Sequence, residues 1–147
     1  MPLPNRPFQS ELARGVYYER LVGGFLSNFG IANKPGPYRG ADIVLPDGRT
    51  IEVKMRRRTF TCPKDYPDKE AIIDSKQCWD KKEPKPLAYI IVSHDTGKMV
   101  CTRGFTPEKW KEKSVPNNRN GKHVCYVIEK KYLRPIESLV DFLRAKS

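Results

Sequence analysis

Residues 40–54 read GADIVLPDGRTIEVK, two short apolar stretches separated by a proline, an aspartate and a glycine. The apolar stretches predict two strands, and the residues between them are typical of the turn of a β-hairpin. Charges are costly in a strand that buries one face, so the acidic side chains at the outer ends of this hairpin, Asp42 and Glu52, require an explanation.

Two turn geometries fit this stretch. A two-residue turn at Asp47-Gly48 would place Asp42 and Glu52 on opposite faces of the sheet. A three-residue loop that begins at the preceding proline would pair Asp42 directly with Glu52. The proline presets the first turn position and Gly48 supplies a left-handed residue, which favours the three-residue loop. We therefore expect Asp47 to serve only the turn, and Lys54 to lie on the same face as the two carboxylates.

Two carboxylates directly opposite each other destabilise a sheet, and a bound cation would remove that cost. Oxygen ligands favour Mg²⁺, with Mn²⁺ as a substitute, over zinc. The pattern Glu-x-Lys occurs at residues 52–54, 83–85 and 129–131. Only the first instance has an aspartate placed opposite its glutamate, so the sequence indicates a metal site at Asp42 and Glu52.

A third carboxylate lies in residues 10–30, where the apolar spacing predicts a helix that begins after Ser10 and stops at Gly30. Glu19 shares a face of this helix with apolar residues. It is either a solvated glutamate at the border of the apolar stripe, or the helix packs on the sheet and directs Glu19 toward the Asp42–Glu52 pair.

Further along the chain the sequence predicts a helical segment near 71–82, strands at 87–94 and 98–104, a short helix at 106–113 capped by Thr106, a strand at 123–133 and a closing helix at 135–146. This order predicts an α/β fold with a central mixed β-sheet, an N-terminal helix and flanking helices. We expect a single domain over residues 1–147, with a core at about 10–105 and the C-terminal strand and helix, 122–146, in the same domain.

The charge of the chain points to a polyanionic partner. Its 28 basic and 17 acidic residues give a net charge of +11, and residues 51–147 hold 22 of the basic and 13 of the acidic ones. A run without acids, KMRRRTFTCPK, spans residues 54–64. Such a field favours a phosphate backbone, and the alternative is a solubilising surface.

Other features exclude some classes of protein. The four cysteines stand more than ten residues apart without a Cys-x-x-Cys pair, which disfavours structural zinc. Cys101 and Cys125 are expected to serve as small hydrophobic strand residues. The absence of a long apolar run or a secretory signal predicts a cytoplasmic protein, in the host cytoplasm if a phage encodes it, with no membrane partner.

The helix with Glu19, followed by a hairpin carrying Asp42 and then Glu52-x-Lys54, resembles the PD-(D/E)xK nuclease superfamily. Residues 14–58 are similar to the start of the archaeal and phage Holliday junction resolvases, although alanine rather than proline precedes Asp42. The resemblance implies a restriction-endonuclease-like core and a Mg²⁺-dependent endonuclease that hydrolyses phosphodiester bonds in DNA, including branched DNA. It also implies a homodimer and a role in DNA recombination or repair.

In that chemistry, Asp42, Glu52 and the Val53 carbonyl would hold the metal, and Glu19 would complete the site directly or through water. Lys54 would orient or activate the attacking water. Five basic residues are the candidates for binding nucleic acid: Arg39, Arg56, Arg57, Arg58 and Lys64. If the second hairpin strand continues, Arg56 and Arg58 would share the face of Lys54. Two alternative functions remain, a nucleic-acid-binding protein with an inactive nuclease fold, and a basic adaptor or inhibitor that binds an acidic protein.

Overall fold

The structure is a computed structural model that describes residues 7–37, 42–105, 108–117 and 121–145. A six-stranded sheet has the order β1-β2-β3-β5-β6-β9, with β1 (Lys34–Pro35), β2 (Ile43–Val44), β3 (Thr50–Arg56), β5 (Ala88–Ser93), β6 (Met99–Arg103) and β9 (Arg134–Pro135). A three-stranded sheet has the order β4-β8-β7, with β4 (Glu70–Ser75), β7 (Trp110–Asn117) and β8 (Gly121–Glu129). The helices are α1 (Pro7–Asn28), α2 (Lys76–Lys81) and α3 (Ile136–Ala145), and two 3₁₀ turns are η1 (Pro63–Asp65) and η2 (Lys130–Tyr132).

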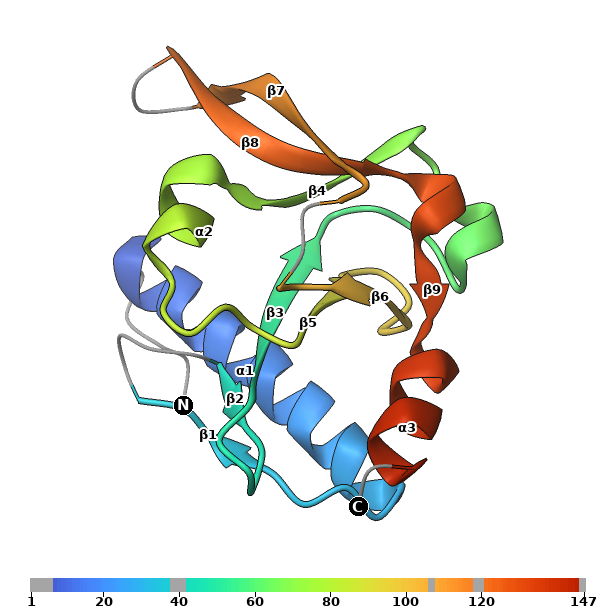
Figure 1. The fold of residues 1–147 in the computed structure, drawn as a ribbon. Helices are drawn as coiled ribbons and strands as arrows, with labels where there is room; N and C mark the ends of the chain where they lie inside the picture. The colour runs from blue at the N-terminus through green and yellow to red at the C-terminus, as the bar shows by residue number, and fades with distance from the viewer. Residues whose placement is uncertain (1–6, 38–41, 106–107, 118–120, 146–147) are drawn as a thin grey trace.

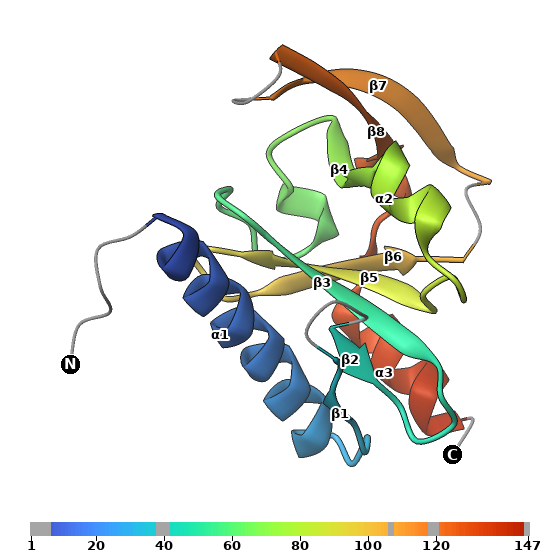
Figure 2. The same cartoon turned by 90° about the vertical axis from the view of Figure 1, so that its left-hand side faces the viewer.

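The six-stranded sheet is mixed, because β3 and β5 are parallel while its other neighbouring strands are antiparallel. Figures 1 and 2 show α1 and α3 on one face of this sheet, and the three-stranded sheet with α2 on the other. All six residues of β5 are buried, as expected of a strand covered on both faces. The connection from β3 to β5 runs through β4 and α2, so this crossover carries part of the second sheet.

Each face of the central sheet packs into its own hydrophobic core. On the helical side, α1 contributes Tyr18, Val22 and Leu26, which lie one turn apart and are buried. On the opposite side, Tyr89 and Ile91 of β5 pack with residues of the three-stranded sheet. In the segments that the structure describes, no helix is long and apolar enough to cross a membrane.

The predicted central mixed sheet, the N-terminal helix and the closing helix are confirmed. The predicted stop at Gly30 is also confirmed. Gly30 has φ +80°, and the N–H groups of Gly30 and Ile31 donate to the carbonyls of Ser27 and Leu26 at 3.0 Å. Ser10 was the wrong N-terminal cap, because α1 begins at Pro7, and proline is well tolerated in the first turn of a helix.

Two other predictions were wrong. The segment 71–82 is not one helix: its first half is β4, and α2 begins only after Ser75, whose hydroxyl accepts the Cys78 N–H at 3.1 Å. The second half of the helix predicted at 106–113 is strand, since β7 starts at Trp110 and pairs with β8 along its whole length. Residues 106 and 107, including the predicted cap, lie outside the described residues. In both places pairing with β8 outweighs the local preference.

Candidate active site

The hairpin β2–β3 has the predicted three-residue loop. Ile43 pairs with Ile51, and the Leu45 N–H donates to the Arg49 carbonyl at 2.8 Å. Gly48 has φ +90°, a backbone conformation that suits glycine. The Asp47 carboxylate accepts the Arg49 N–H at 3.0 Å and the Arg49 side chain at 2.7 Å, which confirms that Asp47 serves the turn.

This register brings Asp42 and Glu52 together. Asp42 lies one residue before β2, and its Oδ2 accepts the Val53 N–H at 2.8 Å. Glu52 is only 6% exposed, and it shares a hydrogen bond with the Asp42 carboxyl group. The predicted contact between the hairpin carboxylates is therefore present.

Helix α1 places Glu19 against Asp42, so the helix packs on the sheet with this glutamate directed toward one member of the pair. Glu19 is half-buried and hydrogen-bonds Asp42. Burial, and then the hydrogen bond and negative charge of Asp42, raise the pKa of Glu19 to about 7. The same causes raise the pKa of Glu52 to about 8, although Lys82 and Lys54 oppose the shift. Within this carboxyl cluster of Glu19, Asp42 and Glu52, the two glutamates thus retain protons to a higher pH than isolated glutamates do.

A cavity of about 400 Å³ opens onto this cluster between α1 and the segment that precedes β2. Glu19 and Asp42 line it, together with Gly23 and Gly24 of α1. Gly24 leaves the helix surface open here, and Glu19 and Asp42 are reached from this cavity.

A second buried carboxylate lies on the face of the central sheet that carries Glu52 and Lys54. Asp74 of β4 is 5% exposed, and its Oδ1 lies 3.5 Å from the Lys54 ammonium. The Tyr89 hydroxyl donates to Asp74 Oδ2 at 2.6 Å. Burial raises the pKa of Asp74, but Lys54, Tyr89 and Lys82 together bring it below its ordinary value. Asp74 is therefore a charged partner that fixes the position of the Lys54 side chain.

Lys82 links the two groups of carboxylates. Its ammonium, at the C-terminal end of α2, lies 3.5 Å from Glu52 Oε1 and 3.4 Å from Asp74 Oδ2. Buried carboxylates are stable only when they are paired or protonated, and Lys82 and Lys54 supply positive charge on the side away from Asp42.

The sequence interpretation missed Asp74, Lys82 and Tyr89. The available signal was a single aspartate inside the apolar run AIIDS, residues 71–75, which a strand would have to bury with a partner. Strand β4 carries a bulge between Ile72 and Asp74, so that Ile73 and Asp74 are both buried although they are neighbours in the chain. Such bulges redirect side chains beside functional sites.

The predicted nucleic-acid-binding residues have different surroundings. Arg57 and Lys64 are exposed, and Arg58 pairs with Asp68 at 2.9 Å. Strand β3 ends at Arg56, so the condition that would have put Arg58 on the Lys54 face is not met. Arg56 is partly buried: its Nη2 donates to the Ile72 carbonyl at 3.0 Å, and burial lowers its pKa. Arg39 lies outside the described residues.

Among the residues that the structure describes, no three His, Cys, Asp or Glu side chains are placed to hold a metal ion together. The Asp42–Glu52 pair still suits Mg²⁺, because this ion often takes one or two protein carboxylates and fills its other positions with water and substrate phosphate. The two free thiols on β6 and β8, Cys101 and Cys125, are buried, as the sequence predicted.

Comparison of the chain with known protein families and with curated proteins finds no match. The features of this chain that bear on its function are therefore the carboxyl cluster, its two lysines and the basic surface.

Proposed function

We propose that the protein is a Mg²⁺-dependent DNA endonuclease with a restriction-endonuclease-like core. One observation carries the proposal: Asp42 and Glu52 are in contact at the end of a hairpin, and Lys54 follows on the face of Glu52. Two facing carboxyl groups suit a divalent cation, because the cation offsets their mutual repulsion.

The side chains of the cluster would have separate roles in hydrolysis. Asp42 and Glu52 would hold Mg²⁺, with the Val53 carbonyl as a further ligand. The bound ion would lower the pKa of the attacking water and offset negative charge on the phosphate. Glu19 lines the cavity and hydrogen-bonds Asp42, so it is placed to order water there. Lys54, held by Asp74, would stabilise the charge that develops on the scissile phosphate.

The substrate class follows from charge and from the resemblance to resolvases. A net charge of +11 attracts a polyanion, and a site of hard oxygen ligands beside lysines suits phosphodiester hydrolysis. We infer that the enzyme prefers branched DNA and acts as a homodimer, because a two-fold symmetric enzyme matches the near two-fold symmetry of a four-way junction.

The first experiment is cleavage of supercoiled plasmid with Mg²⁺ or Mn²⁺. The variants Asp42→Asn and Glu52→Gln should lose roughly 100-fold or more of the activity, because each removes a ligand and a negative charge. Asp47→Asn is the matched control: it is the same substitution on the same hairpin, asparagine also suits the turn, and activity should be nearly unchanged.

Full activity of Asp42→Asn or Glu52→Gln would refute the metal site. If the wild-type protein binds DNA and never cleaves it, with either metal, the alternative of a binding protein on an inactive nuclease fold replaces the proposal. Thermal unfolding of each variant without metal checks that the fold survives, and the melting temperature should hold or rise because one carboxylate repulsion is gone.

A further inference from the structure

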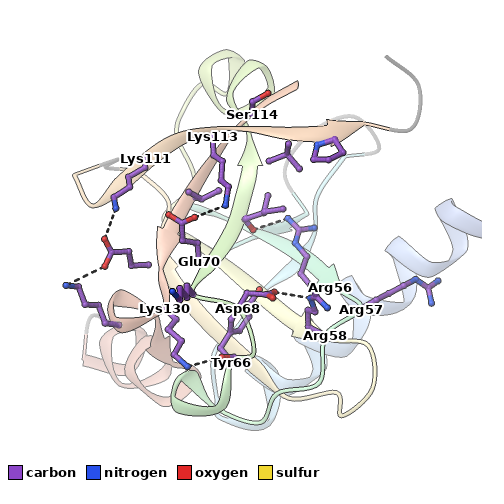
Figure 3. Close-up of a pocket in the computed structure, with 17 residues that line it drawn as sticks. Arg56, Arg57, Arg58, Tyr66, Asp68, Glu70, Lys111, Lys113, Ser114 and Lys130 are labelled. Atoms are coloured by element: carbon purple, nitrogen blue, oxygen red, sulfur yellow. Dashed lines mark hydrogen bonds and ion pairs between the residues drawn. The ribbon is translucent and has the colours of Figure 1, made fainter. Parts of the chain in front are cut away.

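A groove of about 970 Å³ runs between the outer face of the three-stranded sheet and the end of β3. Figure 3 shows Lys111 and Lys113 of β7 reaching into it from one side, with Arg56 and Arg58 on the other; Arg57 lies beside them, and its side chain extends away from the lysines. The sequence interpretation placed 106–113 in a helix and gave Lys111 and Lys113 no role. The strand β7 changes this, because alternate residues of a strand point to the same face.

The groove is strongly basic. Its lining holds eight basic residues, Arg56, Arg57, Arg58, Lys69, Lys111, Lys113, Lys130 and Lys131, and three acidic residues, Asp68, Glu70 and Glu129. Each acid is already paired with a cation of the groove, for example Glu129 with Lys111 at 2.8 Å and Glu70 with Lys113 at 2.9 Å.

These pairs leave the lysines free to exchange partners. The side chains of Lys111 and Lys113 are 60% and 58% exposed. Exposed ion pairs contribute only about 0–1 kcal/mol, so phosphate oxygens can replace the carboxylates at little cost to the fold.

Two side-chain contacts between β3 and β4 lie between the groove and the catalytic lysine. Lys54 contacts Asp74 in the first, and Arg56 donates to the Ile72 carbonyl in the second. Residues two apart on a strand are separated by about 7 Å, so the groove begins about that far from the catalytic lysine. A nucleic-acid backbone that spans this distance would contact both the groove and the catalytic lysine.

We propose that this groove, with Lys111 and Lys113 of β7, holds the sugar-phosphate backbone of the nucleic acid next to the scissile bond. The inference deepens the proposed function and rests on it for the identity of the ligand. The cations are spread along the groove from the end of β3 to η2, which fits a ligand with a regular row of negative charges.

The test measures the affinity of the whole chain for a labelled DNA duplex. Binding is monitored by fluorescence anisotropy in EDTA, at several salt concentrations. Lys111→Gln combined with Lys113→Gln should weaken binding and lower the slope of log affinity against log salt by about two, one for each lost phosphate contact. Arg103→Gln combined with Arg134→Gln is the control. It removes the same charge from exposed positions on β6 and β9, outside the groove, and should leave the slope nearly unchanged.

Equal slopes for the wild-type protein and the Lys111/Lys113 variant would overturn the inference, as would an equal loss in the Arg103/Arg134 control. If polyglutamate displaces the DNA at equal charge concentration, the groove fits an acidic protein instead, and the inference is again wrong. Plasmid cleavage is measured separately. DNA binding that depends on the groove without any cleavage would contradict the nuclease proposal alone, whereas cleavage with groove-independent binding would contradict the groove alone.

Discussion

Glu52 is an acid that the fold keeps from water and places against another acid, and its protonation is therefore coupled to folding. An unfolded glutamate releases its proton near pH 4.5, whereas Glu52 in the folded protein holds it up to about pH 8. Between these values the folded state binds more protons than the unfolded state, so its stability falls as the pH rises.

We predict that, in EDTA, the melting temperature of the wild-type protein decreases from pH 5 to pH 8, because the free energy of unfolding falls over this range by an amount on the order of a few kcal/mol. Glu52→Gln should remove most of this dependence, and Mg²⁺ should stabilise the wild-type protein more at pH 8 than at pH 5, because fewer protons compete with the ion. Differential scanning fluorimetry across this range is the measurement. A flat or rising curve for the wild-type protein would contradict the burial argument.

Asp74 allows a test of positioning. Asp74→Asn keeps the shape of the side chain but removes the charge that faces Lys54, and we predict a fall of roughly 10–100-fold in the cleavage rate with little change in the KM for DNA. The control is Asp80→Asn, which removes a carboxylate bound to Tyr126 and Lys76 on α2 and should leave the rate unchanged. A loss confined to KM would assign Asp74 to substrate binding instead.

The residues of the site differ in how far the sequence could predict them. Asp42, Glu52 and Lys54 were predictable because one short hairpin fixes their relation, and turn chemistry sets its register. Asp74 was not, since its partners come from three other elements: Lys54 on β3, Lys82 after α2 and Tyr89 on β5. Nothing local in the chain says that these elements meet.

At the scale of the elements, the hairpin loop determines whether the two carboxylates meet at all. We predict that Gly48→Val costs about 1–3 kcal/mol, because a β-branched residue resists a φ of +90°, and that it abolishes cleavage by disturbing the register. Gly97→Val is the matched control, with φ +71° in the turn between β5 and β6.

Both glycine variants should lose a similar amount in thermal unfolding, but only Gly48→Val should lose cleavage at a temperature where both are folded. Cleavage retained in Gly48→Val would mean that the register does not position the site. The hairpin and the Gly30 stop were predictable from turn residues a few positions apart, whereas β4 was not, because it pairs with β8, which lies about 50 residues later in the chain.

At the scale of the molecule, the second sheet is the main feature that the sequence did not predict. It covers the face of the central sheet that carries Glu52 and Lys54, and it supplies Asp74 and the basic groove from the same three strands. Local patterns indicate strands and helices, but the layer that each joins depends on contacts between distant segments.

The proposed homodimer and its preference for branched DNA can be measured directly. Sedimentation of the wild-type protein should show a dimer, and binding of Asp42→Asn without metal should be tighter for a four-way junction than for linear duplex of equal length. Two sites related by a two-fold axis would then cut two strands symmetrically. If the protein is a monomer without a preference for junctions, the resolvase function is contradicted and a general nuclease activity remains.

The bulge in β4 also bears on insertions and deletions. Removing one residue from a regular strand moves every later side chain to the other face of the sheet. In β4, Ile72 pairs with Val127 and Asp74 with Tyr126, so Ile73 is the extra residue. Its deletion would leave the pairing on both sides in register and would keep Asp74 facing inward. What the protein would lose is the isoleucine that shields the carboxylate from water. A shortened β4 would therefore be a regular strand in which water reaches Asp74, and the ion pair between Asp74 and Lys54 would be weaker.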